Sequence, residues 1–111
     1  MSLADKIRKA RETSVEINGG AWKIRRPTDE EAMSIRANGD GLLAIVKRFV
    51  IDWPLTELDL VPGGTDIKPP FDGEAFAEWV ADKPELWEPL GTGILDAYKA
   101  HADKRDTAVK N

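Results

Sequence analysis

The chain has 111 residues, of which 41% are hydrophobic, and a formal net charge of −4 from 16 basic and 20 acidic residues. This length allows one domain with one core, and the lack of cysteine excludes disulfides, thiolate metal sites and cysteine nucleophiles. The acidic balance argues against general attraction to nucleic-acid phosphates, and no apolar run approaches the about 20 residues of a membrane-spanning helix, so we expect a cytoplasmic protein.

The first elements are predicted from capping and alternation. Ser2 is expected to cap a short amphipathic helix that continues to about Glu12. Apolar residues alternate with polar ones on both sides of Asn18-Gly19-Gly20, which predicts a two-stranded hairpin at about 13–26. The residues whose side chains should pack on helices are Val15, Ile17, Trp22 and Ile24.

Two helices are expected next. Thr28 and Glu31 match a capping box, which predicts a helix over 29–37. Asp40 is then expected to cap a second helix, reaching to about residue 52. Because apolar residues occupy too many positions for a single stripe, this second helix is predicted to be the central buried one.

A loop and two more helices complete the predicted order. The segment 53–70 holds four prolines, which indicates an irregular loop with at most a short turn at 55–60. Asp72 is expected to cap a helix to about residue 81, and Asp82 to cap the last helix.

Within the last helix, Pro89 should kink or delay the start, and Gly91 and Gly93 should soften the same turn. We expect one domain over 1–103 and a flexible tail over 104–111. The predicted fold is α+β and mainly α, with about five helices packed with one N-terminal two-stranded β-hairpin. Largely buried positions are predicted to include Phe49, Trp79, Leu90 and Ile94.

No residue pattern indicates catalysis. His101 is the only histidine, so one chain cannot assemble a histidine zinc site or a serine triad. Gly91-Thr92-Gly93 lacks the preceding strand of a phosphate-binding loop and fits a flexible helical turn better. Capping accounts for the acids at 29–31. We therefore expect a protein that is not an enzyme and that has no cofactor or metal.

A basic first quarter raises the alternative of nucleic-acid binding, since Arg25 and Arg26 follow Trp22 closely. However, Lys23 and Arg25 alternate with Trp22 and Ile24, as the solvated face of a strand would. The solvated face is the favoured interpretation, and no nucleic-acid partner is expected.

Trp53 lies where a helix gives way to the proline loop, and it could either plug the core or anchor a partner. We favour the plug. The loop and the terminal helix nevertheless offer surfaces to other proteins. The candidate partner contacts are Trp53, Pro54, Leu55, Phe71, Trp87 and Tyr98.

The order of these features resembles the tail assembly chaperone family of long-tailed bacteriophages. The resembling segments are the hairpin end and acidic helix (Trp22–Ile35), Arg48–Trp53, Pro70–Phe76 and the opening of the last helix (Asp82–Leu86). Together they span about residues 14–100.

The resemblance implies a non-catalytic protein that coats the tape measure protein until tail tube subunits polymerise around it. It also implies a short form, with a frameshifted longer form recruiting the tail tube protein. Such a protein acts in the host bacterial cytoplasm and is absent from the mature virion.

Two alternatives remain open: a structural phage component, such as a head-tail connector or minor tail protein, and, less favoured, a small nucleic-acid-binding regulator. If the chain coats a long partner, many copies are needed. We therefore expect weak self-association beyond a dimer through the hairpin edge and the proline loop, strengthened by tape measure fragments.

Overall fold

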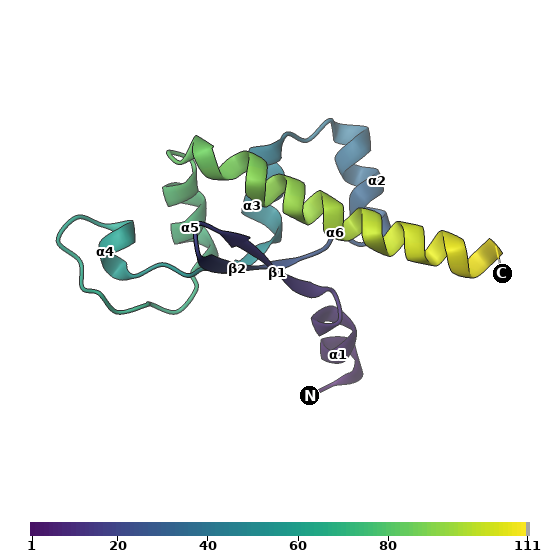
Figure 1. Ribbon diagram of the computed structural model, residues 1–111, viewed down its shortest axis with the longest axis horizontal. Helices are drawn as coiled ribbons and strands as arrows, with labels where there is room; N and C mark the ends of the chain where they lie inside the picture. The colour runs from purple at the N-terminus through teal and green to yellow at the C-terminus, as the bar shows by residue number, and fades with distance from the viewer. Residues whose placement is uncertain (111) are drawn as a thin grey trace.

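The computed structural model describes residues 1–110 and has a mainly helical α+β fold (Figure 1). These residues form six helices and one antiparallel sheet with the strand order β1-β2-β3. The helices are α1 (Leu3–Lys9), α2 (Asp29–Asn38), α3 (Leu42–Phe49), α4 (Glu57–Leu60), α5 (Gly73–Val80) and α6 (Pro84–Lys110), and the strands are β1 (Glu12–Ile17), β2 (Gly20–Arg25) and β3 (Val50–Asp52). The fold class expected from the sequence is confirmed.

The hairpin of β1 and β2 follows the predicted alternation. Asn18 and Gly19 have positive φ angles of 52° and 81°, which fit the two-residue turn that matches the twist of a hairpin. Val15 pairs with Trp22 across the strands. Trp22 and Ile24 are buried, so the face predicted to pack inward does so.

The sheet has a third strand that the sequence analysis misses. The helix expected to reach about residue 52 ends at Phe49, and Val50 takes the extended conformation that starts β3. Ile24 pairs with Val50, and this pairing supplies hydrogen bonds to the otherwise open edge of β2. The prediction of a helix there was wrong because the apolar run Phe49–Ile51 fits a helix and a strand equally well.

The predicted cap of α3 was also wrong. Gly41 is the N-cap residue and makes no side-chain hydrogen bond. The backbone N–H of Asp40 donates to the carbonyl of Ile35, so Asp40 belongs to the end of α2. Gly39, at a φ of 66°, provides the left-handed conformation that ends α2.

Helix α3 is central, as predicted, and packs against both α5 and α6. Phe49, Leu90 and Ile94 are fully buried, whereas Trp79 is only partly buried. The complete set of buried apolar side chains is Trp22, Ile24, Ile45, Val46, Phe49, Val50, Trp53, Phe76, Val80, Leu90 and Ile94.

Helix α6 crosses the body and extends past it (Figure 1). It begins at Pro84 and continues through Pro89, so the proline does not delay it. The flexible tail expected at 104–111 is corrected, since residues 104–110 continue α6; Asn111 lies outside the described residues. Contacts between α6 and α2, described below, account for the continuation.

Candidate partner-binding groove

An open groove of about 800 Å³ lies between the proline-rich loop and α5. We call it the Trp79 groove. Its walls are formed by α4 and the residues on either side of it, and α5 closes the opposite side. The apolar side chains that line it include Leu58, Leu60, Val61, Pro62, Pro70 and Trp79.

The loop wall of the groove is held by its own hydrogen bonds. Thr56 and Asp59 form a capping box at the start of α4. The backbone N–H of Leu58 donates to the Thr65 carbonyl at 2.8 Å, and that of Thr65 donates to the Glu57 carboxylate at 3.0 Å. The long loop therefore has a defined shape before any partner binds.

Trp79 joins the groove to the core. Its ring stacks on Trp22 with 6.2 Å between centroids and 24° between planes. Its indole N–H donates to the carbonyl of Asp59 at 3.2 Å, which ties α5 to α4. Most of the Trp79 side chain is buried, as predicted, although the loop contacts the indole without closing over it.

Trp53 lies beneath the groove and has only 1% of its surface exposed. Its indole N–H donates to the Pro69 carbonyl at 3.1 Å, and the Phe71 ring meets it edge-on at 4.9 Å. The preferred interpretation of Trp53 as a core plug is confirmed. A partner would reach Leu58 and Val61 first, because these side chains are 54% and 52% exposed.

Carboxylates dominate the charged lining of the groove. Hydrogen bonds to Asp59 from the Thr56 amide and hydroxyl lower the pKa of its carboxyl, which keeps it ionised. The charged lining residues are Glu57, Asp59, Asp72, Glu78, Asp82 and Lys83. The groove thus combines an apolar floor with a predominantly negative rim.

The structure does not gather the predicted partner contacts into one surface. Trp53 and Phe71 lie together near the groove, and Leu55 packs against the core. Pro54 lies beside the hairpin turn, since a Cβ on Gly20 would come within 2.9 Å of its Cγ.

Two more of the predicted contacts lie elsewhere. Trp87 donates to the Val80 carbonyl at 2.8 Å and joins α6 to α5, and Tyr98 lies beside α2. Leu58 and Val61, which line the groove and are exposed, are not among the candidate contacts predicted from the sequence. Their signal is the presence of apolar side chains in a proline- and glycine-rich loop, where exposed apolar groups need an explanation.

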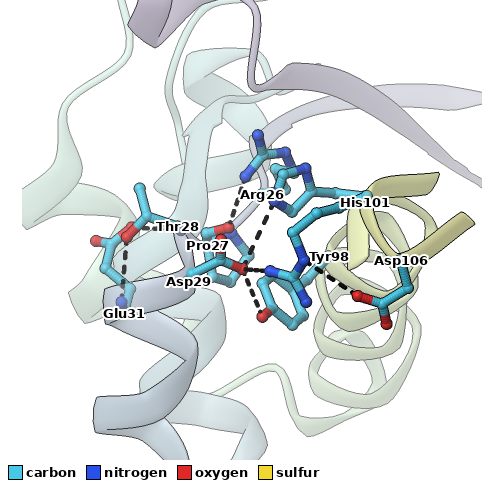
Figure 2. A network of polar contacts seen from close by, with 9 residues as sticks. Arg26, Pro27, Thr28, Asp29, Glu31, Tyr98, His101 and Asp106 are labelled. Carbon is cyan, nitrogen blue, oxygen red and sulfur yellow. Dashed lines mark hydrogen bonds and ion pairs between the residues drawn. The ribbon is translucent and has the colours of Figure 1, made fainter. Parts of the chain in front are cut away.

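A second cluster of polar side chains joins the far half of α6 to the start of α2 (Figure 2). The Tyr98 hydroxyl and the Arg105 guanidinium donate to the Asp29 carboxylate at 2.8 and 2.5 Å, and His101 Nε2 lies 3.6 Å away. The hydrogen bond from Tyr98, followed by that from Arg105, lowers the pKa of Asp29 to about 2. This cluster is structural, since its polar groups are directed at one another.

The basic residues of the hairpin are paired with acids. Lys23 lies 3.2 Å from Glu12, and Arg25 lies 2.9 Å from Glu31. Arg25 is half-buried rather than fully solvated, with its guanidinium 4.5 Å from the Phe49 ring centre. The open cleft beside these residues contains carboxylates as well as basic groups, so its charges largely cancel and give little attraction for a phosphate backbone.

Within residues 1–110, no three acidic or histidine side chains are arranged to hold a metal ion. None of the helices in that span combines the length and hydrophobicity that a membrane crossing requires. Comparisons with protein-family models, curated proteins and solved structures find no match to this chain.

Proposed function

We propose that the chain is a non-catalytic tail assembly chaperone that binds the tape measure protein of a long-tailed bacteriophage. The observation that carries this proposal is the Trp79 groove, a preformed apolar surface with a negative rim. A long helical partner exposes apolar stripes before its assembly is complete, and a groove of this kind can cover them.

The segments that resemble the chaperone family contact one another across the fold. The Trp22 and Phe76 rings lie 5.8 Å apart, from the first and third of these segments. The Arg48 guanidinium of the second segment lies 3.1 Å from the Glu31 carboxylate of the first. Three of the four resembling segments are therefore joined by direct contacts.

The groove favours a helical segment with apolar residues on one stripe and basic residues beside it. Leu58 and Val61 are more than half exposed, and their burial would be favourable at about 25 cal/mol per Å² of apolar area. The carboxylates of the rim would attract lysine and arginine side chains and steer the orientation of the segment. Burial of apolar side chains and attraction between opposite charges provide the binding free energy. The groove needs no catalytic group for this function.

The composition of the virion tests this function against that of a structural tail component. A chaperone should be abundant in lysates of cells that produce the phage and absent from purified particles, as mass spectrometry would show. The tube and tape measure proteins serve as internal standards for the particles. Stoichiometric recovery of the chain with these two proteins would reject the chaperone in favour of a connector or minor tail protein.

A further inference from the structure

Helix α1 projects from the body (Figure 1), with Arg8 beside the cleft that Arg25 and Arg48 line but with none of its own residues buried. Residues 1–10 are all exposed, and Leu3 and Ile7, one helical turn apart, are 74% and 50% exposed. An isolated helix of seven residues is marginal in water even with the capping box that Ser2 and Asp5 provide. An apolar stripe on such a helix gains stability by docking on another surface.

The Trp79 groove complements α1 in both charge and polarity. Five carboxylates and one ammonium group line the groove. In α1 and the two residues after it, Lys6, Arg8, Lys9 and Arg11 outnumber the single acid Asp5. The stripe of α1 would meet the exposed apolar floor of the groove, while its basic residues would meet the negative rim.

The position of α1 favours docking between two copies of the chain. The hairpin turn lies beside Pro54 near the groove, while α1 joins the opposite end of β1 at Glu12. The six residues of β1 separate the two by roughly 17–20 Å. In this structure α1 lies at the opposite end of β1 from the hairpin turn, so its stripe is not in its own groove (Figure 1).

We propose that α1 of one copy docks in the Trp79 groove of a second copy. The contact joins two different surfaces, so each added copy still offers one open groove and one undocked α1. Assembly can therefore continue beyond a dimer. A seven-residue helix covers far less than the about 1,600 Å² of a standard interface, so each contact is weak.

The contact also regulates the groove, and this step rests on the proposed function. A tape measure segment of the same chemical class competes with α1 for the same apolar floor. Copies of the chain therefore cover one another's grooves until the partner displaces α1.

Sedimentation velocity over a hundredfold concentration range tests the contact in the absence of any tape measure protein. We expect the wild-type chain to show a sedimentation coefficient that rises with concentration. The helix variant Leu3→Glu/Ile7→Glu and the groove variant Leu58→Glu/Val61→Glu should each remain monomeric. All four positions are at least half exposed, so the fold should be retained, which circular dichroism would verify.

Two controls carry similarly exposed apolar side chains outside the contact. Met33→Glu changes a residue of α2 that is 72% exposed, and Ile67→Glu changes a loop residue that is 69% exposed and does not line the groove. Both should self-associate as the wild-type chain does.

Mixing the helix variant with the groove variant tests most decisively whether α1 of one copy docks in the groove of another. The helix variant retains a groove and the groove variant retains α1, so the mixture should form one-to-one dimers and nothing larger. A fluorescent peptide of residues 1–12 should bind the helix variant at least tenfold more tightly than it binds a chain that carries both pairs of changes.

A wild-type chain that stays monomeric, a mixture that forms no dimer, or a peptide that does not distinguish the two grooves would overturn the proposal. Such a result would leave the proposed function standing, because no arm contains the tape measure protein.

Discussion

Glu31 connects three elements through one carboxylate. It accepts hydrogen bonds from Arg25 of β2 at 2.9 and 3.1 Å, from Arg48 of α3 at 3.1 Å and from the Thr28 amide at 3.0 Å. Burial acts to raise the pKa of this carboxyl. The hydrogen bonds from Arg25 and Thr28 and the charges of Arg25 and Arg48 outweigh burial and lower the pKa to about 2.

At acidic pH, protonation of the Glu31 carboxylate should therefore lower the free energy of unfolding. The pKa falls from 4.5 to about 2 on folding, so the unfolded chain binds the proton more readily. The contribution of Glu31 is complete above pH 4.5 and is lost as the pH falls toward 2. Glu31→Gln should lower the free energy of unfolding at pH 7 by on the order of 2 kcal/mol and flatten its fall below pH 4.5.

Denaturant unfolding at a series of pH values measures both effects. Glu30→Gln is the matched control, because Glu30 is the exposed neighbour in the same helical turn. Its effect on stability should stay within about 0.5 kcal/mol. An equally steep acid dependence in the Glu31→Gln chain and the wild type would contradict the assignment.

Helix α6 packs closely against the sheet and α3 at two of its glycines. A Cβ on Gly93 would lie 2.6 Å from Cγ2 and 3.1 Å from Cγ1 of Val15, and one on Gly91 would lie 2.6 Å from Leu42 Cδ2. The prediction that these glycines soften the turn therefore misses their main role. They allow α6 to approach the sheet and α3.

Gly93→Ala should destabilise the chain by about 1–2 kcal/mol, because Val15 is β-branched, sits in a strand and cannot swing away easily. An exposed helical glycine would respond in the opposite direction, since alanine favours a helix by about 1 kcal/mol. Thr92→Ala, at the exposed position between the two glycines, should leave stability unchanged or raise it slightly. The melting temperatures of the two variants distinguish close packing at Gly93 from a simple gain in helix propensity. A Gly93→Ala chain that is more stable than the wild type would refute close packing.

The far half of α6 is held at Asp29. Tyr98, His101 and Arg105 lie one turn apart along the helix and converge on that carboxylate. Figure 2 shows Tyr98 and His101 beside Asp29. The periodicity of charged residues in the sequence gives no sign of a partner 76 positions away. For this reason the sequence indicated a flexible tail where the structure has a helix.

Arg105→Ala should cause the far half of α6 to fray. Amide hydrogen exchange of residues 99–108 should become faster, while exchange in α3 should remain unchanged. Lys104→Ala is the matched control, because it removes a neighbouring exposed basic side chain from the same helix with nearly the same small gain in helix propensity. Equal protection of these amides in the two variants would show that the ion pair with Asp29 does not hold the helix.

Features that depend on residues close together in the sequence could be predicted better than those that depend on distant segments. The caps at Ser2, Thr28 and Asp72 and the turn at Asn18 depend on residues within four positions, and the structure contains all of them. The predicted cap at Asp40 is the local exception, because Asp40 belongs to the end of α2. Strand β3 and the Trp79 groove depend on pairing between distant segments. Local patterns cannot specify such pairing, because the residues involved look the same in a helix, a loop or a core.

The whole molecule presents unlike surfaces on different sides of its sheet. It measures 56 × 35 × 24 Å, with α4 and the proline loop on one side of the sheet and α1 on another (Figure 1). Strand β3 covers one edge of the hairpin and leaves β1 as the other edge strand. The β1 edge thus remains open for the self-association expected from the sequence, and the contact proposed between α1 and the groove is a second route to it. Because tape measure segments would share the groove, we now expect them to weaken self-association rather than strengthen it.

The central claim is that the Trp79 groove holds segments of the tape measure protein. Co-expression of the chain with the tape measure protein proposed as its partner tests this most directly, with the soluble tape measure fraction as the readout. The chain should raise that fraction and co-purify with the tape measure protein, Ile67→Glu should do the same, and Leu58→Glu/Val61→Glu should lose most of the effect. An insoluble tape measure protein in the presence of the wild-type chain, or equal activity of the groove variant, would contradict the account.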